Sequence, residues 1–168
     1  MSEIRILQQS AEEMNTIDQT FDLVYYDPPF GLQRDFSMLE ENGEEKSFSD
    51  RWKSFDDYIT WYAEIINAGY KKLNKDGWMY LHNNFIGNAL VLSKVLPTVR
   101  DNFYTNISWK RSGPKNNIRK GWGNIVDSIM VIRKGDPYFE ISARGIAKKR
   151  SRKMTPKNPG QSLLLKVG

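Results

Sequence analysis

The sequence predicts an α/β fold, a sheet whose strands are connected by helices, and three observations support this prediction. A short apolar run rich in β-forming residues, 21–26, stops at two prolines and a glycine. An amphipathic segment follows, with apolar residues at the i, i+3, i+4, i+7 spacing of a helix. Further short apolar runs then alternate with a second helical segment. Strands that alternate with helices are typical of an α/β sheet with crossover helices.

The first strand, residues 21–26, is predicted to end at a rigid loop. Pro28 and Pro29 fix φ and have no backbone N–H, and Gly31 follows them, so neither a strand nor a helix continues here. Residues 32–51 are polar and acidic without a clear period. We therefore expect a long mobile loop over that segment.

The strongest periodic signal is an amphipathic helix predicted over residues 55–73. Ser54 and Asp57 have the spacing of a capping box at its start. Residues 74–77 (Asn-Lys-Asp-Gly) end the helix, and the apolar run 78–81 is predicted as the next strand. The residues on one face of this helix are Phe55, Tyr58, Ile59, Tyr62, Ile65, Ile66, Gly69, Tyr70 and Leu73.

A shorter helix and two more strands complete the predicted fold. The helix is expected over residues 85–96 and ends before Pro97. The strands near 103–110 and 125–133 follow each other directly, which is compatible with an antiparallel hairpin at the sheet edge. Between them, residues 111–124 are polar, basic and rich in glycine.

Length and charge indicate one folded domain with a basic extension. A chain of 168 residues can bury a hydrophobic core, and a hydrophobic content of 39% excludes a disordered composition. We expect the main domain over residues 1–140 and a C-terminal arm over 141–168. The arm is basic and contains no acid, whereas the whole chain carries a net charge of +5. Such an arm is either a solvated tail or a site for a polyanionic partner.

The composition also limits the chemistry. The chain has no cysteine and one histidine, His82, which excludes thiolate metal sites, a cysteine nucleophile and a multi-histidine zinc site. No run approaches the roughly 18 apolar residues of a membrane span, and no signal peptide opens the chain. We therefore expect no metal, no membrane and a cytoplasmic location. His82 ends a predicted strand near the proline-containing loop, and is either a structural residue or part of a site.

The loop Asp27-Pro28-Pro29-Phe30 has the features needed to activate an exocyclic amino group. Ligands of open α/β sheets bind beyond the carboxyl ends of strands, where this loop is expected. The nitrogen of such an amine is a poor nucleophile because its lone pair is delocalised into the ring. The Asp27 carboxylate and the Pro28 carbonyl can each accept one N–H, which frees the lone pair. Pro28 and Pro29 hold that carbonyl in place, and Phe30 offers a flat face for a flipped base.

Residues 21–31, FDLVYYDPPFG, resemble motif IV of the DNA adenine-N6 and cytosine-N4 methyltransferases. The chain is similar to the permuted type, in which motif IV precedes the cofactor motif. An aspartate such as Asp27 in the first position is typical of the adenine enzymes, whereas cytosine-N4 enzymes more often begin with serine. The features that follow in the family's order are an aromatic helix (52–61), a turn ending in glycine (73–77), a strand ending at Asn83, Trp109-Lys110, and a strand ending at Gly135.

The resemblance implies the three-layer α/β sheet of the S-adenosylmethionine-dependent methyltransferase (Rossmann-like) fold, incomplete at the cofactor-binding strand. It also implies methyl transfer from S-adenosyl-L-methionine to a flipped adenine in DNA, without a metal. The catalytic residues would be Asp27, Pro28, Pro29 and Phe30. The cofactor contacts would be Asp27, Gln9, Ser10, Asn158 and Pro159.

The chain departs from the family at the cofactor site. Family members hold S-adenosylmethionine with a strand that ends in Phe-x-Gly-x-Gly, and no such motif occurs here. Residues 121–123 (Gly-Trp-Gly) lie in the basic loop and are not its equivalent. Residues 155–164 resemble the segment that precedes the cofactor strand in the permuted order. We expect either one subunit of a split enzyme, whose different partner subunit carries the motif, or a truncated gene product.

Residues 109–122 combine positive charge with amides and two tryptophans, which suits contacts to phosphates and bases of DNA. A flexible edge loop is the simpler interpretation.

Trp52 and Trp61 are interpreted as core or interface residues and not as base-stacking platforms. An RNA adenine methyltransferase and a non-catalytic nucleic-acid-binding remnant stay open as alternatives. The expected nucleic-acid contacts are Lys110, Arg111, Lys115, Asn116, Asn117, Arg119, Lys120 and Trp122.

Overall fold

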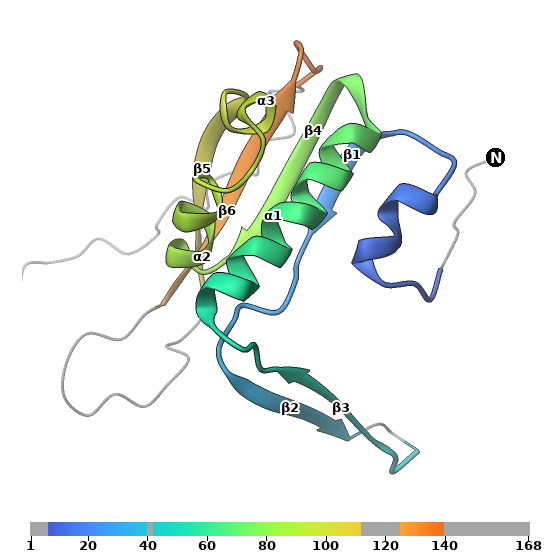
Figure 1. The fold of residues 1–168 in the computed structure, drawn as a ribbon, viewed down its shortest axis with the longest axis vertical. Helices are drawn as coiled ribbons and strands as arrows, with labels where there is room; N and C mark the ends of the chain where they lie inside the picture. Colours follow the sequence, from blue (N-terminus) through green and yellow to red (C-terminus); the bar gives the residue numbers. More distant parts are fainter. Residues whose placement is uncertain (1–6, 40–41, 112–124, 140–168) are drawn as a thin grey trace, which may run out of the picture. The chain divides into compact units, whose positions relative to one another are not determined.

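The computed structural model describes residues 7–39, 42–111 and 125–139 (Figure 1). The chain divides into two units, Met1–Tyr138 and Phe139–Gly168, and all described helices and strands belong to the first. In chain order these are η1 (Ala11–Thr16), β1 (Phe21–Tyr26), β2 (Arg34–Leu39), β3 (Glu45–Asp50), α1 (Phe55–Lys72), β4 (Leu73–Asn83), α2 (Phe85–Val91), α3 (Pro97–Arg100), β5 (Phe103–Lys110) and β6 (Val126–Lys134).

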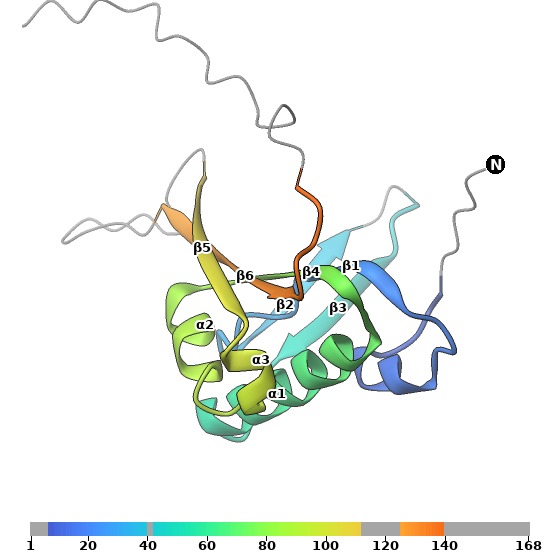
Figure 2. The same cartoon turned by 90° about the horizontal axis from the view of Figure 1, so that it is seen from above.

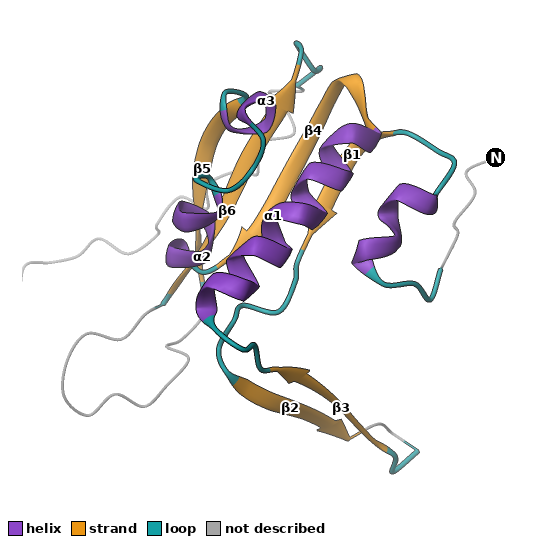
Figure 3. Ribbon diagram, in the orientation of Figure 1, coloured by secondary structure: helices purple, strands orange, loops and turns teal. Residues whose placement is uncertain are grey.

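Four strands form a mixed sheet in the order β1-β4-β6-β5. β1 and β4 are parallel, with α1 as their crossover helix, and β6 runs antiparallel to both β4 and β5. The α/β class is therefore confirmed, and so is the antiparallel pairing of the last two strands (Figure 3). β5 lies at one edge of the described sheet and β1 at the other.

The core lies between the sheet and the helices α1, α2 and α3, which Figure 2 shows on one side of the sheet. Alternate side chains of β4 point to these helices, and Met79 and Leu81 are fully buried there against Tyr62 and Ile66. Trp52 and Trp61 pack against the same core, as interpreted from the sequence. Among the described elements no helix covers the opposite face, where the side chains of Leu23 and Tyr25 are more than half exposed.

α1 spans Phe55–Lys72, which confirms the predicted helix. The Ser54 hydroxyl oxygen accepts a hydrogen bond from the backbone N–H of Asp57 at 3.1 Å, as the capping sequence predicts. The predicted helix over 85–96 is wrong in its second half: α2 ends at Val91, and Pro97 begins α3. One cause is a tertiary contact, since the Leu96 N–H donates to the Asn67 side chain of α1 at 3.0 Å.

The mobile loop predicted over 32–51 is wrong, because β2 and β3 form an antiparallel hairpin there. Its stability comes from cross-strand pairs that composition does not reveal. Phe36 and Phe48 are direct partners and stack with centroids 5.0 Å apart, while the Arg34 guanidinium lies 4.4 Å from the centre of the Phe36 ring.

Within the three described ranges, no helix is long and apolar enough to cross a membrane.

Candidate active site

The loop Asp27-Pro28-Pro29-Phe30 leaves the carboxyl end of β1 and leads into the hairpin. Tyr26 pairs with Leu81 in the parallel register of β1 and β4, so the residues that follow each of them meet at the same end of the sheet. His82, Asn83 and Asn84 therefore lie beside the loop. The loop is therefore confirmed at the carboxyl end of β1, where ligands of open α/β sheets bind.

The backbone of the loop is held by side chains from α1 and the end of β4. The Tyr58 hydroxyl donates to the Pro29 carbonyl at 2.8 Å, and the Asn83 amide donates to that hydroxyl at 2.5 Å. The Asn84 amide donates to the Phe30 carbonyl at 2.9 Å. Burial raises the pKa of Tyr58 well above its usual range, which keeps its hydroxyl a donor at neutral pH.

Asp50, the last residue of β3, holds the exit of the loop. Its fully buried carboxylate accepts hydrogen bonds from the N–H groups of Gly31 at 3.0 Å, Leu32 at 2.7 Å and the Trp52 indole at 3.0 Å. Gly31 has φ +68°, and a Cβ there would lie 2.7 Å from the Tyr58 ring. Glycine is therefore required where the chain turns over that ring.

Two hydrogen-bond acceptors of the loop remain available. In the parts of the chain that the structure describes, no hydrogen bond reaches the Pro28 carbonyl. The Asp27 side chain is 53% exposed, and its carboxylate lies 3.2 Å from Nδ1 of His82. Both acceptors are thus open to an incoming donor.

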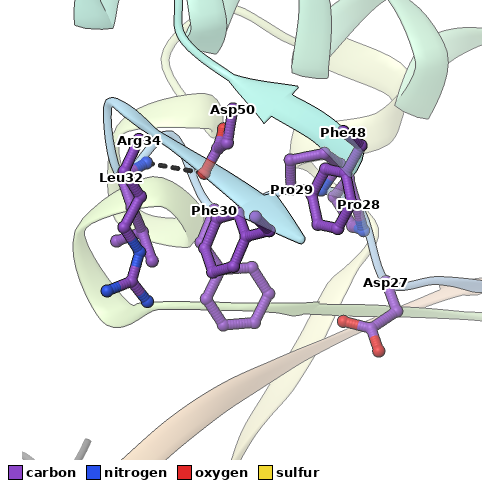
Figure 4. A pocket seen from close by; sticks show the side chains of 9 residues that line it. Asp27, Pro28, Pro29, Phe30, Leu32, Arg34, Phe48 and Asp50 are labelled. Atoms are coloured by element: carbon purple, nitrogen blue, oxygen red, sulfur yellow. Dashed lines mark hydrogen bonds between the residues drawn. The ribbon is translucent and has the colours of Figure 1, made fainter. Parts of the chain in front are cut away.

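A cavity of about 440 Å³ opens beside these acceptors, within the size range of small-molecule sites (Figure 4). The predicted residues of the loop form one part of it, and the hairpin forms the other with the aromatic rings of Phe36 and Phe48. The part of the hairpin in this cavity was not predicted from the sequence. The available signal was the presence of two aromatic residues, Phe36 and Phe48, in an otherwise polar segment. The lining residues are Asp27, Pro28, Pro29, Phe30, Leu32, Arg34, Phe36, Phe48 and Asp50.

A second set of charged side chains adjoins Asp27. Nε2 of His82 lies 3.8 Å from the Asp127 carboxylate, which is paired with Nε of Arg111 at 3.2 Å. The Tyr25 hydroxyl lies 3.1 Å from His82 Nδ1. Burial, and then the charge of Asp27, raise the pKa of Tyr25, so its hydroxyl stays protonated at neutral pH.

The other predicted residues are distributed as follows. Gln9 lines a separate cavity with Thr16 and Ile17, and the exposed Ser10 precedes η1. Lys110 is exposed at the end of β5, whereas Arg111 is the partner of Asp127. Within the described ranges no cluster of three or more His, Cys, Asp or Glu could hold a metal ion. The expected contacts that lie outside the described residues are Lys115, Asn116, Asn117, Arg119, Lys120, Trp122, Asn158 and Pro159.

Comparison with known proteins identifies the family of the chain. A family model described as DNA methylase, of the N6/N4 type, matches residues 21–163. The chain is 23% identical over 130 residues to the DNA adenine methyltransferase YhdJ of Escherichia coli (strain K12), which covers 76% of this chain and 40% of that protein. It is 24% identical over 108 residues to the type II methyltransferase M.HinfI of Haemophilus influenzae, covering 61% of this chain and 30% of that protein. The chain thus spans less than half the length of either relative.

Replacing the buried carboxylate of Asp50 tests how the loop is held. Asp50→Asn places an NH₂ group among three N–H donors and leaves some of them without an acceptor. We expect the free energy of unfolding, measured with urea, to fall by about 2–3 kcal/mol. The matched control is Asp35→Asn on the exposed face of β2, where the carboxylate accepts from Ser49 and Arg51. Equal, small changes in both variants would contradict a structural role for Asp50.

Proposed function

This chain belongs to the DNA methylase family, and from that premise we propose that it activates the exocyclic amino group of a flipped adenine in DNA for methylation. The observation that carries the proposal is the pair of available acceptors, the Asp27 carboxylate and the Pro28 carbonyl, beside an aromatic cavity. A flipped base can stack on aromatic side chains there while its amino group meets both acceptors. The aspartate at position 27 favours adenine over cytosine as the target.

The proposed chemistry follows from the acceptors. S-adenosylmethionine, when bound, supplies an electrophilic methyl group. The Asp27 carboxylate and the Pro28 carbonyl each accept one N–H of the amine, which draws the nitrogen towards tetrahedral geometry and makes its lone pair available. Because Pro29, Phe30, Gly31 and Leu32 are held by hydrogen bonds of their own, the Pro28 carbonyl does not have to be reoriented at the moment of reaction.

The side chains beside Asp27 fit the base but not the whole methyl donor. Phe-x-Gly-x-Gly is absent from the 168 residues. β1 offers a place for an additional strand, since it lies at the edge of the described sheet with Leu23 57% and Tyr25 51% exposed. We propose that a second, different polypeptide supplies the strand that holds S-adenosylmethionine. The contacts proposed for the donor on this chain are Gln9, Ser10, Asn158 and Pro159, together with Asp27.

The proposed DNA contacts are electrostatic. Lys110 is exposed at the end of β5, directly before the basic segment 111–124. Lysine and arginine side chains neutralise phosphates and release counterions, so binding through them weakens as the salt concentration rises. The proposed phosphate and base contacts are Lys110, Arg111, Lys115, Asn116, Asn117, Arg119, Lys120 and Trp122, and the part of the arm from Arg144 to Lys153 is proposed as a further contact to the DNA backbone.

Calorimetry tests whether this chain alone binds S-adenosylmethionine or needs a second polypeptide. The purified chain should show no tight binding of S-adenosylmethionine, because none of its strands ends in the glycine-rich motif that lets the backbone approach the ligand. Titration of the chain together with a polypeptide that carries the motif should show binding. Tight binding by these 168 residues alone would overturn the proposal of a second polypeptide.

Asp27→Ala tests the proposed chemistry. Without the carboxylate, the amine loses one of its two acceptors, and we expect the methylation rate to fall about 100- to 1,000-fold. The measurement is transfer of a radiolabelled methyl group to DNA, with adenine and cytosine methylation scored separately, in the presence of the polypeptide that supplies the donor site. Circular dichroism checks that the variant is folded. Near-full turnover by a folded variant is the result that this mechanism does not allow.

Phe48→Ala tests the aromatic side of the cavity. Loss of one stacking surface should weaken binding of an adenine-containing single-stranded oligonucleotide by about 1–3 kcal/mol. Fluorescence anisotropy measures the affinity. Leu39→Ala is the control, because Leu39 lies on the same hairpin, is 73% exposed and does not line the cavity. If the two variants bind alike, the hairpin is not part of the base site.

A further inference from the structure

We propose that His82 is a positioning residue that orients the carboxylate of Asp27 through the contact between Nδ1 and Oδ1. Nδ1 and Oδ1 are 3.2 Å apart. The inference rests on the proposed function, in which Asp27 accepts an N–H of the target amine. It extends that function by giving His82, the one histidine of the chain, a role in orienting Asp27.

Asp27 needs an external partner to keep its orientation. Its side chain is 53% exposed and follows the last residue of β1. The surrounding backbone is held through Pro29, Phe30, Gly31 and Leu32, and none of those contacts reaches the side chain of Asp27. Over the described part of the chain, no hydrogen bond reaches this carboxylate, and His82 is its sole ion-pair contact. His82 therefore determines which way the carboxylate points.

His82 is itself rigidly placed. It lies near the end of β4, where it pairs with Ile129 of β6, and its side chain is only 17% exposed. The edge of the Phe30 ring approaches the imidazole with centroids 5.5 Å apart. The Tyr25 hydroxyl lies 3.1 Å from Nδ1 on the other side. A side chain enclosed in this way can orient a more exposed neighbour.

In this proposal the proton of the imidazole lies on Nδ1, which faces the oxygens of Asp27 and Tyr25. The Asp27 oxygen can only accept, and the Tyr25 oxygen can accept as well, so Nδ1–H satisfies the groups around it. A bare Nδ1 would instead face the lone pairs of Asp27. On the other side, buried Nε2 has no hydrogen-bond partner, and the nearest Asp127 oxygen lies 3.8 Å away in an ion pair with Arg111.

The two carboxylate oxygens of Asp27 then have different contacts. Oδ1 faces Nδ1 of His82, and Oδ2 remains for the amine of the base. Without His82, the carboxylate can rotate away from the amine although the cavity stays intact. Loss of His82 should therefore lower kcat far more than it raises KM for DNA, because the binding surfaces are unchanged.

The first test reads the imidazole directly. His82 is the only histidine, so ¹⁵N-detected NMR of the labelled chain shows a single imidazole. We expect a protonated Nδ1 whose signal shifts in Asp27→Ala and stays unchanged in Asp35→Asn, a carboxylate on the exposed hairpin. The proposal would be overturned by an unprotonated Nδ1, or by an Nδ1 chemical shift that is the same in Asp27→Ala as in the wild type. Either result would count regardless of the methylation rate.

The second test separates positioning from packing. His82→Leu fills the space without a donor, and we expect kcat to fall about 100-fold. His82→Asn places an N–H near the position of Nδ1 and should recover most of that loss. Tyr80→Phe is the control, since Tyr80 lies two residues away on the same face of β4; it should leave kcat unchanged.

The outcomes distinguish the inference from the proposed function. Full activity in His82→Leu, or equal losses in the Leu and Asn variants, would overturn the positioning role while the methyltransferase assignment stands. If the wild-type chain with its donor-binding partner methylates no nucleic acid, the proposed function fails. The NMR result then still decides whether His82 holds Asp27.

Discussion

The site depends on one buried carboxylate. Asp50 has no exposed surface, and three N–H donors compensate the cost of burying its charge. Two of these donors are the peptide groups of Gly31 and Leu32. The carbonyls of Pro29 and Phe30 are engaged by Tyr58 and Asn84. Four consecutive residues thus have fixed backbone groups, and the Pro28 carbonyl directly before them keeps its acceptor capacity.

The same carboxylate couples the loop to the hairpin. Asp50 is the last residue of β3, so its hydrogen bonds to Gly31 and Leu32 close the segment that contains β2 and β3. The stacked rings of Phe36 and Phe48 are carried by that closed segment and line the cavity with Phe30. The hydrogen bonds of Asp50 to Gly31 and Leu32 therefore have two effects. They stabilise the turn after Phe30, and they hold the rings of Phe36 and Phe48 beside Asp27 and Pro28.

The sequence predicts the parts of this arrangement that local patterns encode. The strand before Asp27 and the helix after Ser54 follow from apolar runs and periodicity, and the chemistry of Asp27 and Pro28 follows from residue types. Asp50 and the hairpin were missed because their stability arises from pairings between residues far apart in sequence, such as Gly31 with Asp50, in a segment of polar composition. His82 was left undecided, since a single residue has no pattern and its role depends on the parallel register that brings it beside Asp27.

Under the proposed function, the chemistry of the available groups selects the kind of base. Asp27 and Pro28 present only acceptors, and an exocyclic amine with two N–H bonds satisfies both of them. A keto oxygen at the same place, as in guanine or thymine, would face a carboxylate and a carbonyl with no hydrogen between them. Desolvated polar groups left unpaired in this way are the strongest source of discrimination between similar ligands. Under the proposed function, adenine and cytosine both satisfy these acceptors, and the cavity walls of Phe30, Phe36 and Phe48 add a constraint on the size of the base.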